Sequence, residues 1–306
     1  MITLAKDGMR GDLERIWRSC FPEDPPEYVK YFFDNRYNPN ACVVYIDDEG
    51  GRPVSMLHML DATITEDSEV VPVQYIYAAA TRADHRGRGI MHRLMEYARR
   101  YAVAKRQKYM VLVPGSRELF RFYEKMGFYR CFKVRSVYMT RDDLIKLSGY
   151  NKNKTSRGAE RPAMLSVSDI ASVRRDILVD REGFIGWDAQ AVKYAAGVHS
   201  VSNGSIVTVA DGSDAGYAFV RPDTPGSVQI TEFIAHSGFD KALVKAVLDA
   251  CDAQRFELRV PVFDEFFSTF GEIIDYGMIR HVADKKPVGL LTLTGSHIPY
   301  IGLALD

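Results

Sequence analysis

The amino-acid sequence predicts an α+β fold of two tandem domains, each a mixed, mostly antiparallel sheet flanked by helices. Three observations carry this prediction. In the first half of the chain, β-rich segments give way to a helical spacing of apolar residues, and the second half repeats that order. A polar stretch separates the halves. With 306 residues, 46% of them hydrophobic, the chain can fill two cores of ordinary size.

The first half begins with helical patterns and continues with β-rich ones. We expect helices at 12–20 and 26–34, then strands at 41–46, 54–60 and 70–80. From Ile90, apolar residues recur on one helical face as far as Tyr101, which predicts a helix that ends near Lys108. A strand, a helix closed by Gly127 and a last strand should follow, at 109–113, 116–126 and 128–139.

A polar segment at 148–162, SGYNKNKTSRGAERP, reads as a linker between domains 1–147 and 163–306. An offset of 147 residues places Val113-Pro114 on Val260-Pro261. The second domain lacks the glycines of the first, so it is predicted to be a degenerate copy. Its expected elements are helices at 168–179 and 188–196, strands at 205–210, 216–221 and 228–235, a helix at 239–251, a strand at 256–260 and a short helix at 263–270.

Composition excludes several classes of protein. Lys plus Arg and Asp plus Glu both number 40, so no net charge attracts the chain to nucleic acid or to an anionic membrane. No apolar stretch has the length of a signal peptide or a membrane span, which predicts a cytoplasmic protein. The four cysteines are scattered without a CxxC, so neither disulfides nor a metal site are expected.

The segment DHRGRGI, residues 84–90, places two glycines between a strand and a helix. A dinucleotide fingerprint would need a third glycine where His92 stands, and a Walker A loop would need Lys and Ser or Thr after Gly89. What remains is a loop whose bare amides approach an anion, such as a pyrophosphate, at a helix N-terminus. The alternative is an ordinary turn with solvated arginines.

The succession of AAAT, HRGRGI, an amphipathic helix, a short strand and SRELFRFYEKMGF resembles the GNAT superfamily of N-acetyltransferases over residues 1–145. Asp84 departs from the family's Q/R-x-x-G-x-G/A pattern at its first position. The resemblance implies acetyl-CoA as acyl donor and no metal. It also implies two groups of cofactor-binding residues: His85, Arg86, Gly87, Arg88, Gly89 and Ile90 at the pyrophosphate, and the backbone of Ala78, Ala79 and Ala80 at the pantetheine. Alternatively, the alanines mark tight packing against a helix.

Tyr123 follows Ser116 by seven residues, as the family's Tyr follows an Asn near the start of its last helix. The resemblance therefore implies that Tyr123 is the general acid that protonates the leaving CoA thiolate, and that Ser116 contacts the cofactor. The alternative for Tyr123 is a core residue on an apolar helical face.

The acceptor side has fewer signals, because the stretch 73–77, VQYIY, contains no carboxylate to act as base. The tandem arrangement resembles the Eis-type acetyltransferases, without their sterol-carrier-like domain. In that group the terminal carboxylate assists deprotonation, which makes Asp306 a candidate base, with water as the alternative. Glu23, Asp24 and Glu27 either attract a cationic amine or cap a helix.

The expected function is an acetyl-CoA-dependent N-acetyltransferase. A primary amine, expected to be small and cationic, attacks the thioester directly in a ternary complex. Two alternatives stay open: acetylation of a protein lysine or N-terminus, and a CoA-binding sensor without catalysis. Homo-oligomers occur among similar proteins, so a homo-oligomer is a further expectation.

Overall fold

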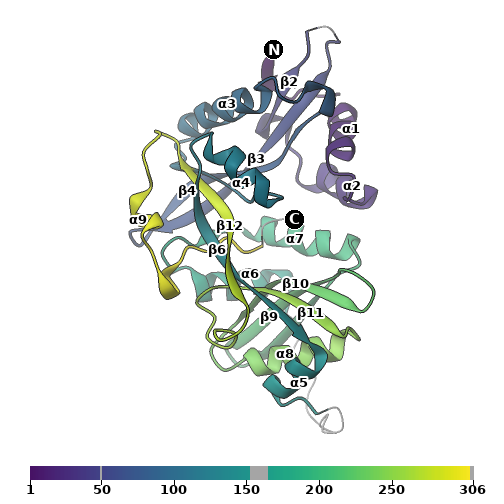
Figure 1. Ribbon diagram of the computed structural model, residues 1–306, viewed down its shortest axis with the longest axis vertical. Coiled ribbons are helices and arrows are strands. Elements are labelled where there is room, and N and C mark those ends of the chain that lie inside the picture. The colour runs from purple at the N-terminus through teal and green to yellow at the C-terminus, as the bar shows by residue number, and fades with distance from the viewer. Residues whose placement is uncertain (49, 152–164, 304–306) are drawn as a thin grey trace. The chain divides into compact units, whose positions relative to one another are not determined.

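The computed structural model describes residues 1–48, 50–151 and 165–303 (Figure 1). These residues form two compact units, each of two segments. Unit 1 comprises Met1–Phe132 and Tyr276–Thr292, and unit 2 comprises Lys133–Asp275 and Leu293–Asp306. The predicted linker at 148–162 falls mainly outside the described residues, and the domain limits 1–147 and 163–306 stay a prediction.

The sheet of unit 1 has the strand order β1-β2-β3-β4-β5-β12. Its neighbours are antiparallel except β4 and β5, which are parallel because the helix α3 crosses between them. The elements are β1 (Ile2–Leu4), α1 (Arg10–Cys20), α2 (Pro26–Asn35), β2 (Cys42–Ile46), β3 (Pro53–Glu66), β4 (Glu69–Thr81), α3 (Ile90–Ala104), β5 (Tyr109–Leu112), α4 (Arg117–Glu124), the end of β12 (Glu272–His281) and α9 (Val288–Leu291).

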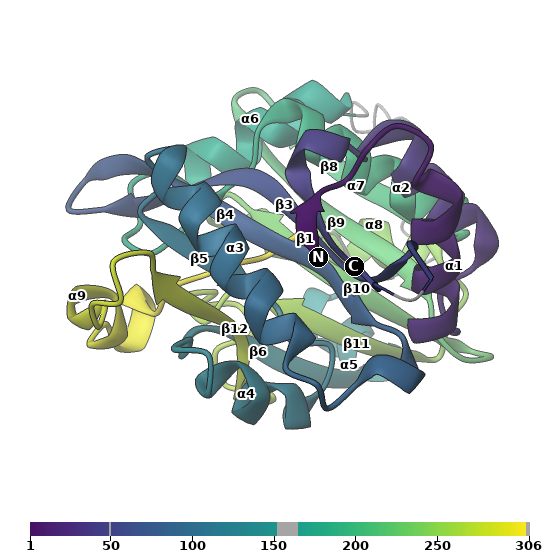
Figure 2. The ribbon, with the colours of Figure 1, turned by 90° about the horizontal axis from the view of Figure 1, so that it is seen from above.

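The two faces of this sheet are covered by different helices. Helix α3 lies over β3, β4 and β5 (Figure 2), and Ile76 and Met59 belong to its apolar cluster. Because side chains alternate along a strand, the neighbours His58 and Tyr77 point to the other face. There they meet Trp17 of α1 and Phe32 of α2. The sheet therefore separates an aliphatic layer under α3 from an aromatic layer under α1 and α2.

Unit 2 repeats this plan with the strand order β6-β11-β10-β9-β8. Strands β10 and β11 are parallel, with α8 between them in the chain, and the remaining neighbours are antiparallel. The elements are β6 (Tyr129–Thr140), α5 (Arg141–Ser148), α6 (Val167–Leu178), β7 (Ile185–Gly186), α7 (Ala189–Val201), β8 (Ser205–Asp211), β9 (Asp214–Pro222), β10 (Ser227–Ala235), α8 (Asp240–Ala250) and β11 (Arg255–Val260). The predicted α+β fold with repeated sheets is confirmed.

Each sheet is completed by a strand from the other half of the chain. In unit 1, β5 pairs with β12, where Met278–His281 face 109–112. In unit 2, β11 pairs with β6 from the first half of the chain. An ion-pair group fixes β12 in unit 1: Arg280 Nη2 lies 2.7 Å from Glu96 of α3 and 2.8 Å from Asp284.

One sequence expectation needs correction, and two of the longer elements were not expected. The short helix expected at 263–270 is a series of turns, in which Asp264 Oδ1 accepts the Phe267 amide at 2.8 Å and competes with helical pairing. The strand β12 was not expected. Nor was α5, which begins with a capping box between Thr140 and Asp143.

In unit 2, a buried polar network holds the segment 299–303. Glu232, which is fully buried, accepts hydrogen bonds from Tyr217 at 2.9 Å and Tyr300 at 3.1 Å, and it pairs with Arg174 at 3.3 Å. Arg174 Nη2 also donates to the Gly302 carbonyl at 3.2 Å. A Cβ on Gly302 would lie 2.0 Å from Tyr300 Oη and 2.2 Å from Glu232 Oε1, so this position requires glycine.

We expect Gly302→Ala to lower the free energy of unfolding by about 3 kcal/mol, because overpacking would force apart a buried ion pair and its phenols. Chemical denaturation followed by circular dichroism measures this. The matched control is Gly289→Ala, where no described atom lies within 4 Å of the new Cβ and φ is not positive. The control should stay within about 0.5 kcal/mol of wild type, and equal losses in both variants would contradict the packing argument.

Candidate active site

Strands β4 and β5 diverge after a short parallel pairing. Their register joins Val73 to Tyr109, Gln74 to Met110 and Tyr75 to Val111, and β5 ends one residue later at Leu112. Strand β4 continues to Thr81, still paired with β3 on its other side. Beyond Tyr75, β4 has no register partner in β5, and a strand edge of this kind suits a ligand with its own amide groups.

A β-bulge lies in this diverging part of β4. The register with β3 shifts between Met56 and His58, so that Ala78 and Ala79 together oppose Leu57. Ala78 has a φ of +46°, in the left-handed region that a non-glycine residue rarely adopts. Such a conformation costs about 1 kcal/mol or more, and bulges of this kind re-aim backbone groups beside functional sites. The predicted cofactor-binding residues Ala78, Ala79 and Ala80 therefore lie at the most distorted point of β4.

The glycine loop follows directly and ends at α3. Gly87 and Gly89 have φ values of +77° and +69°, and no described atom lies within 4 Å of a Cβ built on either. Backbone conformation is thus the reason for glycine at both positions. Gly89 is the N-cap of the 15-residue helix α3, and as a glycine it has no side chain with which to cap the helix. A helix start of this kind suits an anion such as a pyrophosphate.

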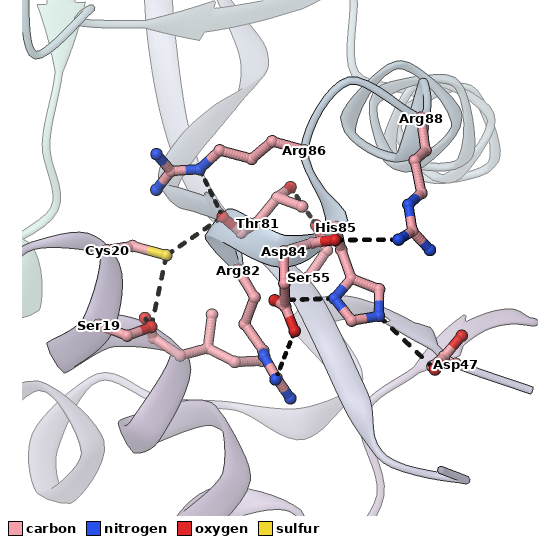
Figure 3. A network of polar contacts seen from close by, with 11 residues as sticks. Ser19, Cys20, Asp47, Ser55, Thr81, Arg82, Asp84, His85, Arg86 and Arg88 are labelled. Atoms are coloured by element: carbon pink, nitrogen blue, oxygen red, sulfur yellow. Dashed lines mark hydrogen bonds and ion pairs between the residues drawn. The ribbon is translucent and has the colours of Figure 1, made fainter. Parts of the chain in front are cut away.

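The two arginines of the loop turn back onto its own backbone (Figure 3). Arg86 Nε donates to the Thr81 carbonyl at 2.9 Å, and Arg88 Nη2 donates to the Asp84 carbonyl at 3.0 Å. On α1, the Cys20 thiol reaches the same Thr81 carbonyl at 3.4 Å. Both arginines therefore shape the loop, a role that sequence reasoning did not assign to them.

His85 joins the loop to the turn between β2 and β3. Its Nε2 lies 3.6 Å from Asp47, and its Nδ1 lies 2.9 Å from Asp84 Oδ1, at ion-pair distance without hydrogen-bond alignment. The contact with His85 is the main cause that lowers the pKa of Asp84, and the ion pair with Arg82 lowers it further. Ile90 is buried in the apolar cluster under α3 and anchors the helix start.

Tyr123 lies on α4, within the same apolar cluster as Ile76 of β4 and Leu112 of β5. Its ring contacts Phe122 and Phe128, with centroids 5.2 Å and 5.9 Å away. Burial raises the pKa of Tyr123 to about 12, so the phenol is protonated at neutral pH. Ser116 is the N-cap of the same helix. Tyr123 therefore shows the core packing of the alternative interpretation, in a cluster to which both diverging strands contribute.

Sequence reasoning missed three polar groups on the opposite face of β4. The hydroxyls of Tyr77 and Tyr28 form a hydrogen bond. His58, the register partner of Tyr77, lies in the aromatic layer. Of the acidic residues near α2, Asp24 accepts the Trp17 indole N–H at 2.6 Å. No local sequence signal marks these groups, because they come together from α2, β3 and β4. Asp306 lies outside the described residues.

The corresponding helix start of unit 2 carries a carboxylate. Asp240 stands in the first turn of α8, and burial raises its pKa. A carboxylate at this position competes with an anion for the same helix start. This agrees with the absence of a glycine pair from that stretch of the sequence.

Across residues 1–48, 50–151 and 165–303, no group of three or more His, Cys, Asp or Glu side chains is arranged to hold a metal ion. Within the same ranges, every helix is too short or too polar to span a membrane.

Known structures share this fold. A GCN5-related N-acetyltransferase from Anabaena variabilis superposes with a TM-score of 0.71 at 13% identity, covering 92% of this chain and 72% of that one. Eis1 from Mycobacterium abscessus superposes with a TM-score of 0.67 at 14% identity, covering 92% of this chain and 74% of that one. A GCN5-related N-acetyltransferase from Kribbella flavida superposes with a TM-score of 0.67 at 15% identity, covering 92% of this chain and 72% of that one. Identities this low establish the fold alone, and a search of curated proteins finds no match.

Part of the sequence also matches a family model. Residues 2–131 match the model described as an acetyltransferase (GNAT) domain, in agreement with the resemblance stated from the sequence. The matched range contains the bulge, the glycine loop and Tyr123.

We expect the double variant Gly87→Glu, Gly89→Glu to bind acetyl-CoA about 100-fold more weakly in calorimetric titration, equivalent to about 2.7 kcal/mol. Two carboxylates would repel the pyrophosphate, and both side chains would strain a left-handed backbone. The matched control is Gly212→Glu, Gly226→Glu in unit 2, where φ is also positive and no described atom lies near. Unchanged affinity in the first variant, or an equal loss in the control, would show that the loop is an ordinary turn.

Proposed function

We propose that this protein is an N-acetyltransferase that moves the acetyl group of acetyl-CoA to a primary amine by direct attack in a ternary complex. The observation that carries the proposal is the divergence of β4 from β5 at the left-handed Ala78, immediately before the glycine loop. The GNAT domain at residues 2–131 supports acyl transfer as the reaction class.

Donor binding is assigned to backbone groups. The amides of Gly87, Gly89 and Ile90 face the pyrophosphate, where the helix dipole favours negative charge. The free edge of β4 at residues 78–80 pairs with the amide-containing arm of the donor, as a strand would. Arg86, Arg88 and His85 hold the loop in shape, and Ser116 begins the helix that carries Tyr123. Acetyl-CoA itself supplies the reactive thioester.

Tyr123 is assigned as the general acid. Because burial raises its pKa to about 12, the phenol keeps its proton across the physiological range and can donate it to the departing sulfur. Its membership of the apolar cluster that also contains Ile76 of β4 and Leu112 of β5 supports this assignment.

The proposed acceptor is a primary amine, and we expect it to be a small cationic compound. Its proton is taken by water or by the terminal carboxylate of Asp306, since no carboxylate occurs in 73–77. Release of thiol from acetyl-CoA with a small amine, compared with acetylation of peptides, separates this function from its alternatives. Binding of acetyl-CoA without any acceptor-dependent thiol release would favour a sensor.

We expect Tyr123→Phe to lower kcat about 100-fold while the Kd for acetyl-CoA changes less than about twofold, because the ring remains and only the acid is lost. Steady-state thiol release and calorimetry measure these quantities. The matched control is Tyr97→Phe, a tyrosine packed against the same cluster, which should leave kcat unchanged.

The pH profile adds a second readout. With the Tyr123 pKa near 12, kcat of the wild type should not fall between about pH 8 and about pH 10 through loss of the acid. An alkaline limb in that range that disappears in Tyr123→Phe would contradict the assigned pKa. Equal kcat in Tyr123→Phe and Tyr97→Phe would remove Tyr123 from the chemistry.

We also expect one acetyl-CoA per chain. The carboxylate of Asp240 stands in the first turn of α8 in unit 2, where it competes with a second pyrophosphate for the helix start. The stoichiometry from calorimetric titration should be about 1. A value near 2, reduced to 1 by the Gly87→Glu, Gly89→Glu change, would show that unit 2 binds the donor as well.

A further inference from the structure

The last residues of β4 are held by a side chain of β3. Ser55, which is fully buried, donates its hydroxyl proton to the Ala80 carbonyl at 2.8 Å. Its oxygen also lies 2.8 Å from the Thr81 hydroxyl. A serine hydroxyl has a single proton, which is used at Ala80, so Thr81 is the donor in this second bond. The Thr81 hydroxyl, the Ser55 hydroxyl and the Ala80 carbonyl therefore form one directed chain of hydrogen bonds.

This chain of hydrogen bonds decides which way a peptide group faces. All peptide bonds of the described residues are trans, and in a trans peptide the C=O and the N–H point in opposite directions. Because Ser55 holds the Ala80 carbonyl on the side of β3, the Thr81 amide is directed to the other side of β4. That side is the open edge, where β4 has no register partner in β5 beyond Tyr75.

The next peptide group faces the reverse way. Arg82 donates its amide to the Val54 carbonyl of β3 at 3.0 Å, which directs the Thr81 carbonyl to the open edge. There Arg86 Nε donates to it at 2.9 Å, and the Cys20 thiol lies 3.4 Å from it (Figure 3). The chain itself thus occupies this carbonyl, whereas the preceding peptide group directs an amide to the same edge.

We propose that Ser55 is a positioning residue for donor binding, which holds the peptide group between Ala80 and Thr81 so that its N–H meets a carbonyl of the pantetheine arm. This rests on the proposed function. The arm carries amide groups, whose carbonyls need donors of fixed direction. The left-handed Ala78 interrupts the ladder with β3 just before this peptide group, so a side chain of β3 is well placed to restore its direction.

The test compares two ligands that share the nucleotide half of the donor. Acetyl-CoA contains the pantetheine arm, and 3′-phospho-ADP lacks it. In calorimetric titration we expect Ser55→Ala to raise the Kd for acetyl-CoA about tenfold, and the Kd for 3′-phospho-ADP less than about twofold. The glycine loop keeps its own conformation in this variant, whereas a merely structural loss would affect both ligands alike.

Thr81→Val removes only the first hydroxyl of the chain of hydrogen bonds. We expect a smaller rise in the Kd for acetyl-CoA, and the double variant should be no worse than Ser55→Ala, because the Thr81 hydroxyl reaches Ala80 only through Ser55. Circular dichroism verifies that each variant folds. If Ser55→Ala does not fold, Thr81→Val decides alone: it must weaken acetyl-CoA and spare 3′-phospho-ADP.

Ser148→Ala is the matched control, because it also removes a buried serine hydroxyl that donates to a backbone carbonyl, that of Leu144 at 2.7 Å in α5. Both Kd values should stay unchanged in this variant. If Ser55→Ala behaves like the control, or weakens both ligands equally, the inference is wrong while the proposed function stands. If the wild type binds no acetyl-CoA, the donor site of the proposed function fails and the inference fails with it.

Discussion

The functional part of the molecule depends on one constraint: β4 must leave β5 while it stays paired with β3. An edge with unpaired amides and carbonyls is unstable in water and open to aggregation unless something covers it. Here the departure is enforced by the bulge at Ala78–Ala79, and the chain then turns through the glycine loop into α3. The same geometry that frees the edge of β4 thus places a helix N-terminus at its end. Arg86 links the two parts, because it bonds from the loop back to Thr81.

In unit 2, which has the same strand plan, side chains of the chain itself occupy the region near the strand irregularity. Strand β10 runs parallel to β11 and carries a register irregularity beside Ile230 and Glu232. At that point Glu232 is enclosed by Arg174 and two phenols, and Gly302 fits against it without room for a Cβ. At the start of α8, unit 2 carries the carboxylate of Asp240. The polar groups around Glu232 are satisfied within the chain, as expected for a buried interior.

Local sequence signals predicted much of this architecture, because period and glycine chemistry are local properties. The spacing of apolar residues predicted the helix from Ile90 and the strands around 42–46 and 109–112. The glycines at 87 and 89 predicted a loop, and both have the positive φ that glycine allows. The bulge was not predictable, since alanine carries no signal for a left-handed backbone. The place of β12 was not predictable either, because it depends on an ion pair between Arg280 and Glu96, two residues that are distant in the sequence. The Tyr28–Tyr77 pair joins α2 to β4 and has no local signature.

The burial of Tyr123 also limits how it can act. A phenol with a pKa near 12 would give its proton uphill to an alkyl thiolate, whose conjugate acid has a pKa of about 8.5. That difference corresponds to about 5 kcal/mol for complete transfer before the C–S bond weakens. A hydrogen bond to the sulfur that strengthens as negative charge develops needs no such early transfer, and it is strongest in an apolar surrounding like the cluster under α3.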